Sequence, residues 1–126
     1  MAKNVLGQAL ACCCTDPMTG YFRDGFCRTD ATDAGRHVVC AIMTEAFLAF
    51  TRSRGNDLIT PRPDYRFPGL KPGDRWCLCA LRWREAYEEN ARTGTAVVPP
   101  VLLACTHQRA LQYVTMEMLR EHAFEE

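Results

Sequence analysis

The stretch "HVVCAIMTEAFLAFTRSRG", residues 37–55, carries the pattern of a strand followed directly by a helix. It opens with an apolar, β-branched run of strand length. Thr44 then offers a hydroxyl suited to cap a helix N-terminus, and apolar side chains recur on one face of the ten residues that follow. Gly55 is a natural helix stop. The stretch therefore predicts a strand over Val38–Thr44 and a helix over residues 45–54.

Two later segments repeat this order of an apolar run and a helix. The run Trp76–Ala80 leads into a helix over residues 81–93, which Gly94 ends. The run Val101–Thr106 leads into a short helix through Leu111, with Thr106 as its cap, and Thr115 begins a last helix. The spacing of these units is uneven, so they form at most a weak strand–helix repeat.

An early turn and a long loop complete the expected architecture. Asp24-Gly25 between short aromatic runs predicts a two-residue type I′ hairpin. Residues 55–74 contain four prolines and form no regular element, but Tyr65, Phe67 and Leu70 should anchor them as an ordered loop. A hairpin followed by strand–helix units predicts an α+β two-layer sandwich, a mixed sheet with helices on one face.

Length and composition narrow the classes of protein. The 126 residues suit a single domain, residues 1–126, and Lys+Arg balance Asp+Glu at 15 each. The charge therefore gives no reason to expect nucleic acid or a membrane as partner. No apolar segment approaches the roughly 18 residues of a membrane helix, and the start is a poor signal peptide. These features indicate the cytoplasm, where the eight cysteines should be mostly reduced; a disulfide scaffold is the less favoured interpretation.

The cysteines form the most unusual feature of the chain. Cys77 and Cys79 lie two apart on an expected strand, which places both on one face. They could bind Zn²⁺ or another thiophilic metal if other sulfurs approach, and the candidate ligands are Cys13, Cys14, Cys27, Cys77 and Cys79. No Cys-x-x-Cys pair is present, which weakens a zinc prediction. The alternatives are reactive thiols or core residues, since cysteine packs well as a small hydrophobe.

Two further cysteines have simpler interpretations. Cys40 stands within an apolar run and should be a core residue. Cys105 precedes Thr106 and His107, so a nucleophile–base pair is conceivable there, but the apolar run before it favours burial. His37 and His122 are expected to be surface or satisfied side chains.

Polar side chains gather in the turns and in the long loop. Loops on a rigid scaffold often carry binding groups, and arginine holds carboxylate or phosphate bidentately. These residues predict a site for a small anionic ligand, although they could instead pair with one another and pin the loop. The candidates are Arg23, Asp24, Asn56, Asp57, Arg62, Asp74, Arg75 and His107.

The longer motifs resemble a known family. The segments "TDPMTGYFRDGFC", "HVVCAIMTEAFLAFTRSRGNDL", "TPRPDYRFPGLKPGDRWCLCALRWREA" and "PPVLLACTH" are similar to an uncharacterised, mainly bacterial group catalogued as domain of unknown function 2237. The resemblance covers roughly residues 4–123 and implies a small two-layer α+β fold, but no activity. It also implies shared thiols at Cys14, Cys27, Cys40, Cys77 and Cys79, often at Cys13, with Cys12 and Cys105 as departures.

Three hypotheses for function follow. The leading one is a thiol-lined, arginine-rimmed site that binds a soft metal ion or a small anionic ligand. The alternatives are a thiol-dependent enzyme or redox protein, and a structural or interaction module whose cysteines belong to the core. A shared site requires at least one pair of sulfurs from different segments within about 5 Å of each other.

Overall fold

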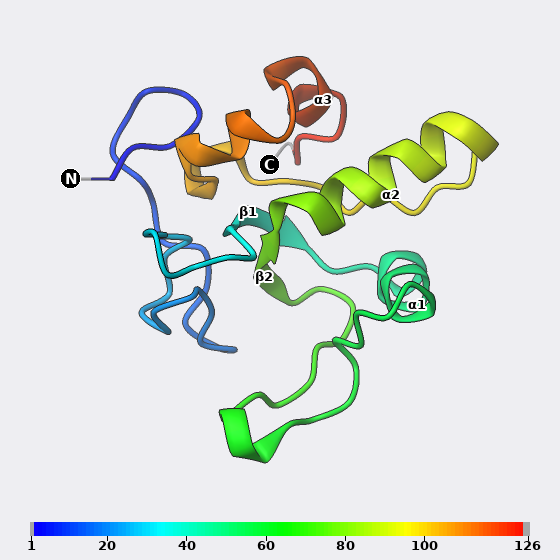
Figure 1. Ribbon diagram of the computed structural model, residues 1–126, viewed down its shortest axis with the longest axis horizontal. Helices are drawn as coiled ribbons and strands as arrows, with labels where there is room; N and C mark the ends of the chain where they lie inside the picture. The colour runs from blue at the N-terminus through cyan, green and yellow to red at the C-terminus, as the bar shows by residue number, and fades with distance from the viewer. Residues whose placement is uncertain (1, 125–126) are drawn as a thin grey trace.

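Two antiparallel strands form the centre of the protein, and a computed structural model describes residues 2–124. Strand β1 spans His37–Ile42 and strand β2 spans Arg75–Cys79. Helix α1 (Glu45–Ser53) follows β1, helix α2 (Ala80–Thr93) follows β2, and α3 (Met116–Glu121) lies near the end of the chain. Figure 1 shows α2 leaving the end of β2 without a loop. The expected α+β class is confirmed.

Local capping residues set the ends of these helices. The Thr44 hydroxyl accepts a hydrogen bond from the Phe47 amide at 3.1 Å, and Thr115 caps α3 in the same way. Gly94 ends α2 in the left-handed conformation with φ of 76°, which glycine adopts at little cost. The predicted helices after the first two strands and at the end of the chain are therefore confirmed.

Alternation along the strands separates two clusters of buried side chains. In β2, Trp76 and Leu78 join the main core with Phe47 of α1 and Trp83 of α2. Cys77 lies in a second cluster, in which Cys40 stands opposite it on β1. This second cluster, called here the sulfur cluster, consists of Cys13, Cys27, Cys40, Cys77 and Cys105 with Leu102.

The predicted hairpin around Asp24-Gly25 is wrong, because residues 21–27 form no strand. The Asp24 carboxylate accepts from the Phe26 amide and makes a side-chain turn, and positive φ occurs at Arg23 and Gly25. The Gly25 carbonyl accepts from the amides of Cys13 and Cys14. The carbonyl of the turn residue Gly25 thus pairs with the preceding segment, and the residues on either side of the turn form no strand pair.

The third predicted strand, over residues 101–106, is reduced to single bridges. Val101 bridges Ala41 of β1 in antiparallel sense and Ala123 in parallel sense, so the parallel pairing lies beside the two-stranded sheet, which is itself antiparallel. Thr106 does not cap the next helix: its hydroxyl bonds the Cys40 amide and the Leu102 carbonyl. His107 caps the short 3-10 helix Gln108–Gln112 instead.

The long loop of residues 55–74 is held by backbone pairing and by two of its three predicted anchors. Arg62 and Phe67 exchange backbone hydrogen bonds around the 3-10 turn Pro63–Tyr65. Phe67 and Leu70 are buried, whereas Tyr65 is 65% exposed and does not anchor the loop. Figure 1 shows the loop extending below the strands, in green.

The length and polarity of the helices decide whether any of them could span a membrane. Within residues 2–124, every helix is too short or too polar to cross a bilayer.

Candidate active site

Four of the eight cysteines are joined in two disulfides inside the sulfur cluster. Cys13 bonds Cys40 and Cys27 bonds Cys77, with Cα–Cα distances of 5.9 and 5.3 Å. The prediction that sulfurs from different segments meet is confirmed. The expectation that the cysteines are mostly reduced is wrong for these four. Their partners lie 27 and 50 residues apart, so no local spacing revealed the pairing.

The predicted metal ligands separate into two groups. The sulfurs of Cys13, Cys27 and Cys77 lie within 4.8 Å of one another and are buried, in the part of the chain that the structure describes. Cys14 and Cys79 are half-buried and lie outside this group. Cys77 and Cys79 therefore do not share a site, although they are two residues apart on one strand.

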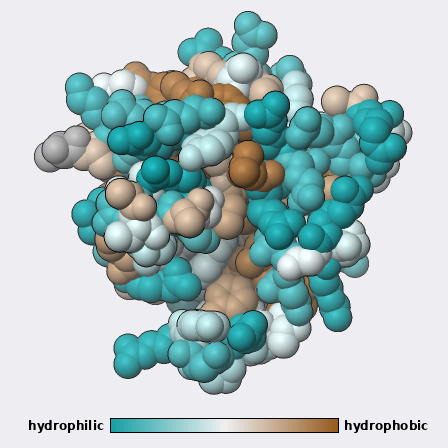
Figure 2. All heavy atoms as spheres, in the orientation of Figure 1, coloured by the Kyte–Doolittle hydropathy of each residue, from teal (hydrophilic) through white to brown (hydrophobic). Residues whose placement is uncertain are grey.

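A recess of about 660 Å³, including the open space at its mouth, lies between the long loop and β2. In Figure 2 apolar surface is visible between the loop at the bottom of the view and the body of the molecule. Polar groups at its wall include a thiol, an imidazole and two guanidinium groups. The lining residues are Arg23, His37, Asn56, Asp57, Leu58, Arg62, Tyr65, Phe67, Trp76, Leu78 and Cys79.

Cys79 and His37 both line this recess. They are opposite each other in the strand register, at the end of β2 and the start of β1. A methyl group added at Gly35 would lie 2.9 Å from His37 Cε1, 3.4 Å from Nε2 and 3.2 Å from Cys79 Sγ. Both side chains thus lie next to the same bare backbone.

Asp33 holds the far side of the imidazole. Its Oδ1 lies 2.6 Å from His37 Nδ1, and its Oδ2 accepts from the His37 amide at 2.9 Å and the Thr29 hydroxyl at 3.0 Å. The carboxylate is fully buried. With Nδ1 directed to Asp33, Nε2 is left for the sulfur, which fixes the ring in one orientation.

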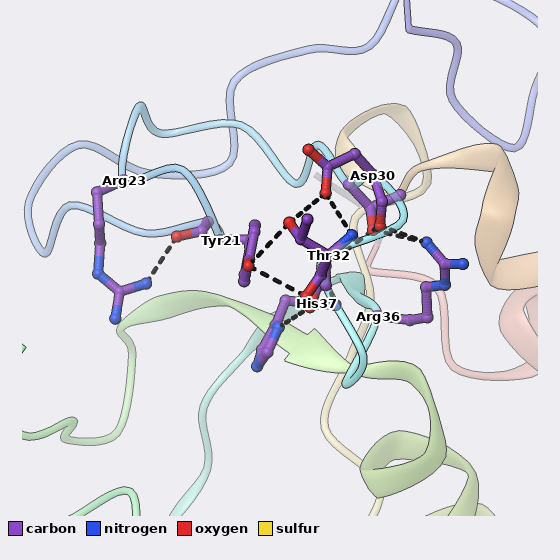
Figure 3. Close-up of polar contacts among 9 residues, drawn as sticks. Tyr21, Arg23, Asp30, Thr32, Arg36 and His37 are labelled. Carbon is purple, nitrogen blue, oxygen red and sulfur yellow. Dashed lines mark hydrogen bonds and ion pairs between the residues drawn. The ribbon is translucent and has the colours of Figure 1, made fainter.

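The loop that carries Asp33 is itself well fixed, as Figure 3 shows. Asp30 accepts from the amide and hydroxyl of Thr32, and Arg36 donates to the Asp30 carbonyl at 2.7 Å. Tyr21 bonds Thr32 through its hydroxyl and stacks on His37, with ring centroids 6.1 Å apart. The imidazole is therefore enclosed on one face and bonded at one edge.

These contacts favour the imidazolium. The hydrogen bond to the Cys79 sulfur, the charge of that sulfur and the bond to Asp33 raise the pKa of His37 to about 9, against the opposing effect of burial. The imidazole is thus protonated at neutral pH, beside a cysteine.

Cys79 also stands at the N-terminus of α2. It is the N-cap residue, and its side chain makes no capping hydrogen bond. The Ala80 amide donates to the Arg36 carbonyl, but the amides of Leu81 and Arg82 have no intrahelical acceptor. The partial positive charge of a 14-residue helix therefore adds to that of His37 at the sulfur.

Four of the eight predicted ligand-binding residues line the recess: Arg23, Asn56, Asp57 and Arg62. Asp24 instead pairs with Arg28 at 2.6 Å, and Asp74 binds the Lys71 amide. Asp74 and Arg75 border other hollows of the surface.

His107 does not line the recess either, and its side chain caps a short helix. Its Nδ1 accepts from the Arg109 amide, and burial lowers the pKa of the ring. The neighbouring Cys105 thiol donates to the Cys12 carbonyl.

Sequence reasoning missed His37 and Asp33, the two residues that make the site. His37 was expected to be a surface or satisfied residue because it opens a strand. Two signals were available in the sequence. Asp33 and His37 are four residues apart, and His37 and Cys79 each stand at one end of an expected strand. Pairing the two strands in antiparallel sense brings the start of one, His37, to the end of the other, Cys79.

Comparison with known proteins agrees with the resemblance. No curated protein matches the chain at a significant level. Residues 3–123 match a family described as an uncharacterized protein conserved in bacteria, DUF2237. Since this match covers nearly all of the 126 residues, the chain belongs to that family.

Proposed function

We propose that the protein is a thiol-dependent enzyme in which Cys79 is the nucleophile, His37 the acid–base partner and Asp33 the residue that orients His37. The observation that carries the proposal is the series Cys79–His37–Asp33 at the wall of a recess. Nucleophile, base and orienting carboxylate in this order recur in enzymes that transfer acyl groups.

The reaction class that best suits the groups is acyl transfer through a thioester. In the proposed resting state the proton is on His37 and the sulfur is the thiolate. The sulfur attacks the substrate carbonyl carbon, the C–S bond forms, and His37 gives its proton to the departing atom as the old bond breaks. Water then attacks the thioester with His37 as base; the acid leaves, His37 keeps the proton taken from water, and the sulfur is released as the thiolate of the starting state.

The helix terminus supplies a suitable place for the negative oxygen of the intermediate. The amides of Leu81 and Arg82 project at the N-terminus of α2, next to Cys79. Donors of this kind stabilise the oxyanion more than the ground-state carbonyl, which is how they accelerate acyl transfer.

Acylation by 4-nitrophenyl acetate tests the proposal. We expect a burst of about one nitrophenolate per protein and an acetyl group on the Cys79 peptide by mass spectrometry. Cys79→Ala should abolish the burst, whereas Cys14→Ala, which removes another half-buried thiol outside the recess, should leave it intact. Acetyl groups found mainly on Cys12 or Cys14, or no burst, would contradict the assignment.

A second candidate function rests on the sulfur cluster. After a dithiol reductant opens both disulfides, Cys13, Cys27 and Cys77 have the proximity that Zn²⁺ or another thiophilic ion requires. Reduced protein purified without a histidine tag should then retain about one Zn²⁺ through gel filtration, and a Cys13→Ala variant should not. Absence of metal in the reduced, folded protein would remove this candidate.

The cytoplasm remains the proposed compartment, and the disulfides provide its test. Cytosolic thiols are normally kept reduced, so both pairs would have to resist reduction through burial. Trapping thiols in intact cells with an alkylating agent before lysis should show whether Cys13, Cys27, Cys40 and Cys77 are paired there.

A further inference from the structure

We infer that the substrate carries an anionic group, recognised by Arg23, joined through a flat apolar portion to the carbonyl that Cys79 attacks. This inference rests on the proposed function and specifies the class of substrate. It follows from the arrangement of charge and apolar surface along β2.

Arg23 is held in place by its backbone and by one hydrogen bond. Its φ of 54° lies in the left-handed region, where a residue other than glycine is uncommon and incurs strain. Nη1 donates to the Gly20 carbonyl at 2.6 Å, and the guanidinium lies over the Trp76 ring, 5.2 Å from its centroid. A strained backbone that places a side chain at a recess is typical of functional positions.

The charge of Arg23 is not neutralised by the protein. Within residues 2–124 it makes no ion pair with a carboxylate, whereas Arg62 at the same recess lies 3.7 Å from Asp64. The nearest candidates are engaged elsewhere: Asp24 bonds Arg28, and Asp57 accepts from Ile59 and from the amide and hydroxyl of Thr60. Guanidinium N–H groups that remain at the recess suit a carboxylate or phosphate.

Apolar surface separates this cation from the thiol. Trp76, Phe67 and Leu78 line the recess, and Phe67 packs edge-on against Trp76 with centroids 5.2 Å apart. Arg23 lies over Trp76 near the start of β2, and His37 lies opposite Cys79 at its end. Figure 3 shows Arg23 and His37 at separate points along this strand. Three residues of strand span about 10 Å, the length of a substituted aromatic ring. A flat molecule with an anion at one end fits this arrangement.

Two matched alkylating probes test the inference: 4-(iodoacetamido)benzoate and its neutral analogue 4-(iodoacetamido)benzamide. Both alkylate by the same reaction, in which the sulfur bonds the CH₂ carbon and iodide leaves, and they differ only in the charge of the group at the far end of the ring. Peptide mass spectrometry gives a rate for each cysteine. We expect Cys79 to react roughly tenfold to a hundredfold faster with the benzoate, as one charge-assisted contact implies. The exposed Cys12 should show a ratio near one.

Arg23→Gln should bring the Cys79 ratio close to one, and Arg28→Gln should not. Arg28 is the matched control because it also lies over an aromatic ring, Phe22 at 4.9 Å, but does not line the recess. If Arg23→Gln misfolds, the unaltered protein provides a second test. Added salt should screen the contact between the benzoate and Arg23 and so lower the ratio of the two rates at Cys79.

The outcomes distinguish the two proposals. A Cys79 that reacts faster than Cys12 with both probes equally would overturn the anionic substrate and leave the thiol enzyme standing. A Cys79 that reacts no faster than Cys12 with either probe would overturn the thiol enzyme as well.

Discussion

Cys77 and Cys79 are two residues apart on β2, yet they occupy opposite kinds of environment. Cys77 is 1% exposed, bonded to Cys27, and its amide donates to the buried Thr19 hydroxyl at 2.9 Å. Cys79 keeps its thiol at the recess, opposite a histidine and at a helix terminus. The same residue type is thus bonded and buried in the middle of the strand, whereas at its end it is the proposed nucleophile. The role of each thiol follows from its neighbours.

The prediction that Cys77 and Cys79 share one face of the strand is wrong because the end of β2 is irregular. The register of β1 against β2 shifts between His37 and Val39, next to Cys79. The backbone of Cys79, with φ of −56° and ψ of 128°, already turns into α2. Its side chain therefore lines the recess together with Leu78 instead of joining Cys77 in the sulfur cluster.

The largest difference between the two thiols should appear on removal of Cys79. Cys79→Ala should reduce the acylation rate by at least about 1,000-fold, because no other group replaces the nucleophile. The free energy of unfolding should change by less than about 1.5 kcal/mol, since the side chain is half-buried and makes no disulfide. Acylation kinetics and urea melts measure the two quantities; a large loss of stability with retained activity would reverse the assigned roles.

Removal of the other thiol, together with its partner, should affect stability instead. The double variant Cys27→Ala, Cys77→Ala removes a bond that closes a loop of 50 residues. Loop entropy alone implies a loss of about 4 kcal/mol. Denaturant melts of the oxidised protein and the variant measure this difference. Equal stability would show that the pair is not bonded in solution.

A methyl group at Gly35 should disturb the site with little effect on the fold. Gly35→Ala places a carbon 2.9 Å from His37 Cε1, which forces the imidazole to move relative to the sulfur. We expect a roughly tenfold slower alkylation of Cys79, as misplacement of a catalytic group implies. Thermal melting and the reactivity of Cys12 serve as controls. An unchanged alkylation rate would show that the reactivity of Cys79 does not depend on the position of His37.

The smallest expected effect is a pH dependence of stability. The pKa of His37 is raised from 6.5 to about 9, so its protonated form stabilises the folded state. This contribution is fully present below pH 6.5 and is lost as the pH rises through about 9. The free energy of unfolding should therefore fall more steeply over this range in the native protein than in His37→Gln. The same pH dependence of the free energy of unfolding in both proteins, measured by urea melts, would contradict the raised pKa of His37.

The sequence predicted the elements more successfully than their contacts. Capping by Thr44 and Thr115 and the stop at Gly94 are local signals, and each is present in the structure. The hairpin predicted at Asp24-Gly25 is absent because the Gly25 carbonyl accepts from the amides of Cys13 and Cys14, a pairing that local propensity does not reveal.

The residues of the site were predicted only in part, because some of them are brought together by contacts between distant segments. Arg23, Asn56, Asp57 and Arg62 were identified because loops with arginine and amide groups favour binding. His37 and Asp33 gain their roles from strand pairing and from a buried carboxylate. Those are tertiary properties, as are the two disulfides between distant segments.

The reactivity of Cys79 is tested most directly by the alkylation rate of each cysteine in the native, oxidised protein at neutral pH, measured with iodoacetamide and peptide mass spectrometry. We expect half-buried Cys79 to react fastest, ahead of the exposed Cys12. The disulfide-bonded Cys13, Cys27, Cys40 and Cys77 should not react until the protein is reduced and unfolded. Cys12 reacting first, with Cys79 modified only after unfolding, would contradict the prediction for Cys79.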